Sequence, residues 1–371
     1  MTANFDTMPE SFGLTAAQRA ALAADPADGS DRVALLAAHS GEPDLKALTQ
    51  ALAELRGRHD VLRMTIRRGD DGPVGVVGSR TVVPVELATE PPHPVNGFLP
   101  RRLDLTRGPL VHVALFSDDS GRILLGFQAH PVVLDEEAIY HAIHELGLLY
   151  RYFAGDGPIP PAARIGYQEH AVRARPAAGR VPRRTTVATH EIGSDTADRL
   201  RLIASSLGLP VALLVLAAWT ISDPEASAKA AAPVAASLPG PSGWPPLGPT
   251  CNRVLLRANP GSAGDLADLA KQLDKATADA EPDDGATPVT FTFHDHRADT
   301  GGGVFQVAEM GSMLTPSEVS LAVHGTPAAG WRLSLAHRPG TASAQGARAT
   351  LARMAGLLEK TGVALIDEEL L

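Results

Sequence analysis

Helix and strand patterns alternate along both halves of this chain, and this alternation is the feature that most constrains its fold. In the first half, leucines recur at helical spacing over residues 45–55. The short apolar runs 110–116 and 123–128 are separated by turn-forming residues, which predicts a β-hairpin. An apolar stripe from Ile139 to Phe153 then predicts a helix. Because the second half repeats this mixture, we expect an α/β (α+β) protein.

The length of the chain and one polar stretch predict how it is divided. A chain of 371 residues is long enough for two domains, or for one large domain with two lobes. Residues 173–185 are rich in Arg, Pro and Gly, which indicates a solvated connection. We therefore expect an N-terminal lobe over residues 1–175, a linker over residues 176–186 and a C-terminal lobe over residues 187–371.

Charge, apolar content and cysteine content exclude several classes of partner and site. The net charge of −9 lacks the basic balance that phosphate binding needs, so we expect no nucleic-acid partner. No apolar run approaches the ~18 residues of a membrane-spanning helix, and the N-terminus lacks the basic start and apolar stretch of a secretory signal. The single cysteine, Cys251, forms no internal disulfide and builds no thiolate metal cluster. We therefore expect a cytoplasmic protein with no membrane partner and no metal site.

Five segments of the sequence carry motif-like patterns in a fixed order. They are LTAAQRAAL at 14–22, RHDVLRMTI at 58–66, LDLTRGPLVHVALF at 103–116, YQEHAVR at 167–173 and GPTCNRVLLR at 248–257. In this order they resemble the motifs of the condensation domains of nonribosomal peptide synthetases. The second segment is similar to the family pattern RHExLRTxF, and the last is similar to GxxxNTLxLR.

The resemblance implies a fold, a partner and a cofactor. It implies two chloramphenicol-acetyltransferase-like lobes arranged as a V-shaped pseudo-dimer around a central tunnel. Carrier proteins would dock at the tunnel mouths and deliver acyl or aminoacyl groups on a phosphopantetheine arm. The protein would then need no cofactor of its own, because a peptidyl or acyl carrier protein supplies the arm. Since the chain starts at its own methionine and carries no adenylation or carrier-protein segment, we expect it to act in trans.

The central motif of that family, HHxxxDG, is altered in this chain. Its counterpart is HPVVLDE, in which His130 occupies the first histidine position and Asp135 the aspartate position. Pro131 replaces the second histidine, which the family uses as a base or to position the attacking amine, and Glu136 replaces the glycine. A proline side chain has no titratable group and no hydrogen-bonding atom. We therefore do not expect ordinary peptide-bond formation by this motif.

Four interpretations of the altered motif remain open. The protein could be a condensation-like enzyme with altered chemistry, such as cyclisation, acyl transfer or elimination. It could be related to heterocyclisation domains, whose DxxxxD motif matches this chain only at Asp135. It could be a recruitment module that binds a carrier protein or a tailoring enzyme, as the X domain of glycopeptide synthesis does. It could also be a catalytically inactive subunit that supports a partner.

The candidate site residues come from both halves of the chain. The catalytic candidates are His130, Asp135 and His294, and the candidates for substrate binding are Pro131, Glu136, Asn252 and His296. His130 and Asp135 also have structural interpretations. His130 could hold the strand end, and Asp135 could be a carboxylate paired with an arginine. In the predicted strand around 289–296, the two histidines point to the same side as the neighbouring threonines. They would serve as a general base, or they would belong to a polar strand face turned to water.

Two further polar groups have structural interpretations. One face of the helix that follows the motif carries His141, His144, Glu137 and Glu145. We expect this face to be solvated rather than metal-binding. His59 lies in the RHDVLR segment, where we expect polar contacts at a helix end.

Overall fold

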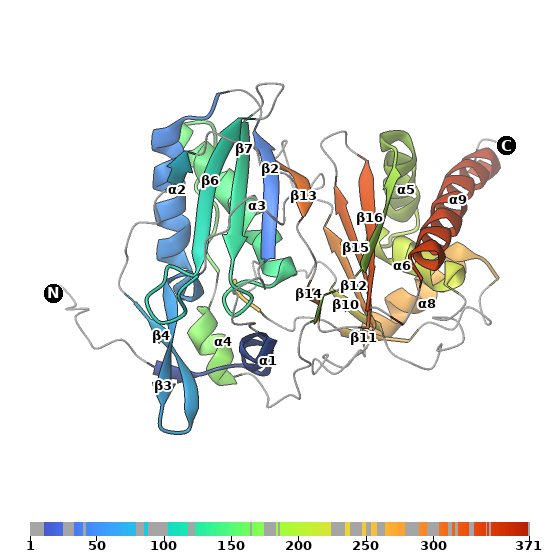
Figure 1. Cartoon of the computed structure of the whole chain (residues 1–371). Helices are drawn as coiled ribbons and strands as arrows, with labels where there is room; N and C mark the ends of the chain where they lie inside the picture. The colour runs from blue at the N-terminus through green and yellow to red at the C-terminus, as the bar shows by residue number, and fades with distance from the viewer. Residues whose placement is uncertain are drawn as a thin grey trace. The chain divides into compact units, whose positions relative to one another are not determined.

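The structure is a computed structural model of the chain. It describes residues 11–24, 33–39, 42–78, 85–87, 103–117, 123–163, 165–173, 183–184, 186–223, 234–237, 247–249, 254–257, 264–278, 289–294, 304–310, 314–315, 318–325, 330–338, 340 and 343–369. Helices and strands interleave through the described residues of both halves, as Figure 1 shows, and this confirms the expected α/β (α+β) class.

The chain forms two compact units. The first comprises Met1–Pro182, Gly240–Thr250 and Gly301–Leu314, and the second comprises Arg183–Pro239, Cys251–Thr300 and Thr315–Leu371. The first change of unit therefore falls within the stretch expected to be a linker. Two short segments of the second half group with the first unit, an arrangement that a single boundary in the sequence does not describe.

A five-stranded sheet forms the centre of the first unit. Its strand order is β13 (Phe305–Met310), β2 (Val33–His39), β7 (Ile123–Ala129), β6 (Val111–Ser117) and β5 (Val85–Leu87). The strands pair antiparallel except for β5 and β6, which are parallel. Figure 1 shows β13, which is distant in sequence, beside β2 in this sheet.

Two helices, α2 (Leu45–Arg58) and α3 (Glu136–Ala154), cover one face of this sheet. Alternating residues of β6 and β7, among them Val113 and Phe127, point into the shared core. The two strands pair as the hairpin that the sequence predicted. The predicted helix after the motif is α3, and it ends at Gly155, whose φ of 85° is the left-handed conformation that glycine adopts readily.

The rest of the first unit surrounds this core. A three-stranded antiparallel sheet has the order β1 (Ser11–Gly13), β4 (Gly72–Val77) and β3 (Met64–Gly69). The short helical elements are α1 (Ala16–Ala24), the 3-10 turn η1 (Asp60–Arg63) and α4 (Tyr167–Arg173).

A six-stranded mixed sheet forms the centre of the second unit. Its strand order is β11 (Val254–Leu256), β10 (Val234–Ser237), β12 (Val289–His294), β15 (Val319–Gly325), β16 (Trp331–His337) and β9 (Thr186–Ile192). Only the β10–β12 and β12–β15 pairs are parallel. The short strands β8 (Arg183–Arg184) and β14 (Leu314–Thr315) form a separate two-stranded sheet.

Among the described residues, four helices pack against one face of this sheet: α5 (Ser194–Ser206), α6 (Val211–Ser222), α8 (Leu266–Ala278) and α9 (Ala344–Glu369). Helix α6 is apolar on all sides and lies at the centre of the layer, where Trp219 stacks on Phe291 of β12 with ring centroids 6.3 Å apart. In the described part of the chain, no single helix is long and apolar enough to span a membrane. The bent pair α5–α6 meets those criteria only when its two helices are taken together.

Candidate functional site

The turn that carries the altered motif begins where β7 ends. The backbone N–H of His130 donates to the Leu110 carbonyl oxygen at 2.9 Å, and the His130 carbonyl oxygen accepts from the Val133 N–H at 2.9 Å. The ring takes part as well, because its Nδ1 accepts from the Val132 N–H at 3.1 Å. His130 is buried, so this bond replaces hydration of Nδ1. The ring therefore holds the end of the strand, which is the structural role considered for it.

This contact also limits the chemistry of the His130 ring. A backbone N–H can only donate, so Nδ1 of His130 must be the unprotonated nitrogen. In a neutral imidazole the proton is then on Nε2. In this arrangement Nε2 of His130 can only donate a hydrogen bond and cannot accept a proton.

Pro131 and the residues that follow it are enclosed by the first unit. Pro131 is buried, and Val132, Val133 and Leu134 belong to the apolar core. The Val132 carbonyl oxygen accepts a hydrogen bond from Nε2 of Gln18 at 3.0 Å. The motif turn is thereby attached to α1.

Gln18 is a residue that the sequence analysis missed. Its side-chain oxygen accepts from the Thr15 N–H at 3.1 Å, while Oγ1 of Thr15 accepts from the Gln18 N–H at 3.2 Å. This reciprocal pair is a capping box, and the sequence signal that predicts it is Thr-x-x-Gln at the start of α1. Gln18 thus caps its own helix with its side-chain oxygen and holds the motif turn with its side-chain nitrogen.

Asp135 and Glu136 lie at the start of α3. Asp135 is the N-cap residue, and its Oδ1 accepts from the Ala138 N–H at 2.8 Å. A carboxylate at this position also interacts favourably with the positive end of the helix dipole. Glu136 is the first residue of α3, and the structure describes only its backbone.

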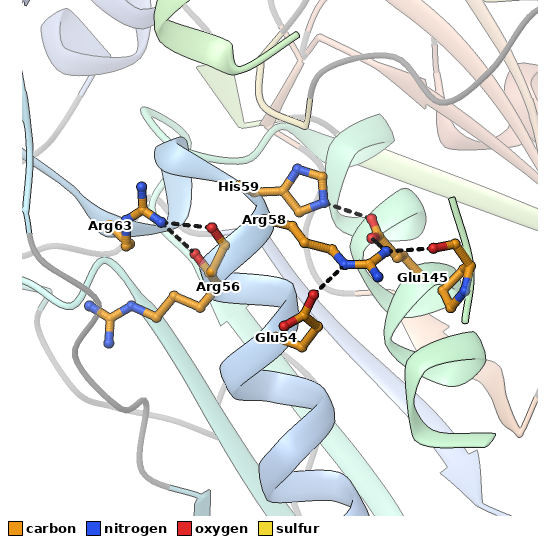
Figure 2. Close-up of polar contacts among 8 residues, drawn as sticks. Glu54, Arg56, Arg58, His59, Arg63 and Glu145 are labelled. Atoms are coloured by element: carbon orange, nitrogen blue, oxygen red, sulfur yellow. Dashed lines mark hydrogen bonds and ion pairs between the residues drawn. The ribbon is translucent and has the colours of Figure 1, made fainter. Parts of the chain in front are cut away.

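A buried charge cluster joins α2 to α3 (Figure 2). The Glu145 carboxylate accepts from Nε2 of His59 at 2.6 Å and from Nη1 of Arg58 at 3.2 Å. Arg58 also donates to Glu54 at 2.8 Å and to the Pro160 carbonyl oxygen at 2.9 Å. Glu145 is only 2% exposed, so the expectation of a solvated helix face was wrong at this position. The end of α2 covers Glu145, and two cationic or polar donors replace its lost hydration.

Two further polar residues of the RHDVLR segment, Asp60 and Arg63, bond to backbone groups at the ends of neighbouring helices. Nη1 of Arg63 donates to the carbonyl oxygens of Arg56 and Gly57 in the last turn of α2, as Figure 2 shows for both contacts. Burial, together with the nearby charge of Arg63, lowers the pKa of Arg56. The Asp60 carboxylate accepts from the N–H groups of Tyr167 and Gln168 at 2.7 and 2.8 Å, at the start of α4. These contacts confirm the expected polar interactions at a helix end.

Tyr167 connects three segments of the first unit. Its hydroxyl group lies 3.2 Å from Oγ1 of Thr15 and donates to the Pro249 carbonyl oxygen at 3.0 Å. Its ring packs so closely on Gly248 that a Cβ atom there would overlap it. The segment around Pro249, although it belongs to the second half of the sequence, is therefore held by the first unit.

The second-half candidates fall on or beside β12. His294 is the last residue of this strand and pairs in register with His324 of β15, but only the backbone of His294 is described. Thr290 and Thr292 are 2% and 5% exposed, so the expectation that this polar strand face is turned to water was wrong. Asn252 and His296 lie outside the described residues.

The described candidates thus divide between the two units. The first unit brings together His130, Pro131, Asp135 and Glu136 as one turn and helix start. His294 lies in the second unit. Among the residues that the structure describes, no group of three or more His, Cys, Asp or Glu side chains is arranged to hold a metal ion.

Comparison with known proteins identifies relatives by sequence. No family model matches the chain. AMB antimetabolite synthetase AmbE from Pseudomonas aeruginosa is 28% identical over 262 residues, which cover 57% of this chain and 12% of that protein. Tyrocidine synthase 2 from Brevibacillus parabrevis is 30% identical over 135 residues, covering 36% of this chain and 4% of that protein. The chain therefore spans only a small fraction of the length of these relatives.

Solved structures identify the fold. The first condensation domain of the CDA synthetase is 17% identical with a TM-score of 0.70, covering 96% of this chain and 97% of that chain. The condensation domain of the Monacolin K polyketide synthase MokA is 14% identical with a TM-score of 0.71, covering 97% and 99%. The X-domain from teicoplanin biosynthesis is 17% identical with a TM-score of 0.64, covering 98% of both chains. This chain has the condensation-domain fold, which confirms the resemblance found in its motifs.

Proposed function

We propose that this protein acts on an acyl or peptidyl group held as a thioester on a carrier protein, in nonribosomal peptide or related biosynthesis. The phosphopantetheine arm of the carrier would be the cofactor. The proposed chemistry differs from ordinary condensation and is cyclisation, acyl transfer or elimination. The observation that carries this proposal is the motif turn, which retains an ordered, buried His130 and a capping Asp135 within the condensation fold but has Pro131 in place of the second histidine.

The geometry of the turn supports a reaction in which this motif donates a hydrogen bond and supplies no base. Because Nδ1 of His130 accepts from Val132, its Nε2–H can stabilise negative charge that develops on a thioester carbonyl oxygen. Pro131 offers no group that removes a proton from a nucleophile. The nucleophile must therefore be deprotonated by another residue or must already be present in its reactive form.

A recruitment module is the second candidate function. It is supported by the likeness to the X-domain from teicoplanin biosynthesis, which covers 98% of both chains. In this case the altered motif would have only a structural role. The hydrogen bonds that His130 and Gln18 make to Val132 in the turn are consistent with this role. The protein would then hold a carrier protein or a tailoring enzyme without changing the tethered group.

Intact-mass spectrometry of a loaded carrier protein separates these functions. A peptidyl carrier protein is loaded enzymatically with a panel of aminoacyl- and peptidyl-pantetheine groups and incubated with and without the protein, and apo-carrier serves as the control. Loss or rearrangement of the tethered group supports the enzyme. An unchanged mass, together with binding that depends on the loaded arm, supports recruitment. If the protein neither changes nor binds any loaded carrier of the panel, both functions are rejected.

A further inference from the structure

A second buried histidine lies beside the motif turn. His112 is on β6, and its partner in the antiparallel register is Gln128 on β7. Both side chains are more than nine-tenths buried. Gln128 is two residues before His130, at the end of the strand that leads into the motif.

The packing of β6 shows which face of the sheet carries His112. Val111, Val113 and Leu115 belong to the core that α2 and α3 cover. Ala114 and Phe116 belong to a separate cluster on the other face. Because side chains alternate along a strand, His112 lies on the face that these two helices do not cover.

Register places His112 close to the motif along the sheet. Side chains directly opposite each other in an antiparallel pair have Cβ atoms about 4.5–5.5 Å apart, and diagonal neighbours are about 7–8 Å apart. Gln128 is the direct neighbour of His112, and His130 follows Gln128 by two positions. The backbone of His130 remains bonded to Leu110, which continues the ladder to the motif. The two histidines are therefore diagonal neighbours on one face of the sheet, a spacing that one bound group could bridge.

We propose that His112 is the general base that replaces the imidazole lost at Pro131. This inference rests on the proposed enzymatic function. As the amine, hydroxyl or thiol nucleophile attacks the thioester carbonyl carbon, His112 takes its proton. The new bond to carbon forms and the C–S bond breaks. The proton then passes from His112 to the departing thiolate, which leaves as the free phosphopantetheine thiol.

The two histidines would have different roles in this step. The Nδ1 contact with Val132 restricts His130 to donating a hydrogen bond from Nε2, whereas His112 makes the proton transfer. Gln128, directly opposite, has a side-chain amide that can donate or accept, so it can fix the ring orientation and tautomer of His112.

Single-turnover kinetics with the loaded carrier that wild-type protein consumes fastest test the role of His112. His112→Gln and His112→Asn keep a polar side chain but remove the base, and general-base catalysis contributes about 10²–10⁴-fold. We expect the rate at saturating carrier to fall by about 100-fold or more, with carrier affinity within about threefold of wild type. Imidazole added to His112→Ala should restore part of the rate, because a purely structural histidine is not replaced by a free base in solution.

His39→Gln is the matched control. His39 is a buried histidine of the same sheet, but its ring packs against Tyr150 and Phe305 on the helix-covered face, with centroids 5.4 Å from each. We expect this variant to lose thermal stability without a comparable loss of rate. Equal loss in both variants, or no imidazole rescue of His112→Ala, contradicts the role of His112.

The remaining outcomes separate this inference from the proposed function. If wild-type protein consumes the loaded carrier and His112→Gln does so within threefold of its rate, His112 is not the base although the enzymatic function stands. If wild-type protein binds the loaded carriers without changing their mass, the enzymatic function fails and the role of His112 fails with it. If the His112 variants do not fold, imidazole NMR of wild-type protein decides. His112 ring resonances that do not shift on saturation with loaded carrier overturn the proposal.

Discussion

Replacing Glu145 by alanine tests the buried charge cluster that joins α2 to α3. The change removes two contacts, from Nε2 of His59 at 2.6 Å and from Nη1 of Arg58 at 3.2 Å. Breaking a buried ion pair by removing one partner costs about 3–5 kcal/mol. Arg58 keeps its bonds to Glu54 and Pro160, so the loss lies at the low end of this range. We expect the first unit to lose about 3 kcal/mol of stability, which is roughly a 150-fold change in its opening equilibrium.

Hydrogen exchange measured by mass spectrometry can locate this loss. Amides of α2 and α3 should exchange roughly 100-fold faster in the variant, while those of the second-unit sheet should keep wild-type rates. Urea unfolding followed by circular dichroism gives the corresponding free energy.

Glu191→Ala is the control for this prediction. Glu191 also pairs with an arginine, Arg332, at 2.8 Å, but its side chain is 67% exposed. Exposed pairs contribute about 0–1 kcal/mol, so we expect almost no change. If Glu145→Ala is no more destabilising than Glu191→Ala, the reasoning from burial is refuted.

Three further predictions concern contacts within the first unit. Gly248→Ala should destabilise the protein by about 1–3 kcal/mol more than Gly155→Ala. Both glycines have positive φ, but only at Gly248 does the new methyl group overlap the Tyr167 ring. Equal melting temperatures of the two variants would contradict this. Gln18→Leu should cost about 1–3 kcal/mol in urea unfolding, because the buried Val132 carbonyl loses its side-chain donor and the Thr15 N–H loses its capping acceptor. A change below about 0.5 kcal/mol would show that neither contact is needed. Burial lowers the pKa of His170, so below about pH 6.5 the unfolded chain binds a proton there more readily than the folded protein does. The stability of the protein should therefore rise with pH up to about 6.5 and stay constant above that pH. Between pH 7 and pH 5, the melting temperature of wild-type protein should therefore fall further than that of His170→Gln, and parallel curves would contradict the pKa shift.

Local patterns predicted much of the first unit. The alternation in 110–116 and 123–128 predicted a hairpin, and the stripe from Ile139 to Phe153 predicted α3. These signals succeed because periodicity and turn residues act within one element or between neighbours in sequence. The capping box of Thr15 and Gln18 is equally local and could have been found by the same reasoning.

Local patterns do not predict the environment of residues that distant segments cover. Glu145 lies opposite the apolar stripe of its own helix, so its periodicity indicated water, but the end of α2 covers it. Thr290 and Thr292 alternate with phenylalanines and looked like a solvated strand face, yet both are buried. A helical or strand period states which residues share a face, but it does not state what covers that face.

The class of the fold, the family resemblance and the replacement of a motif histidine by Pro131 follow from the sequence alone, because they depend on residue identity and spacing along the chain. The pairing of β13 with the sheet of the first half could be seen only in the folded chain, because strand pairing over this separation depends on the packing of the whole unit. Only the structure also showed that the His130 ring accepts from Val132 and that His112 is buried opposite Gln128. The chemistry available near Pro131 depends on those contacts, since a side chain's proton-transfer role is set by its neighbours in space.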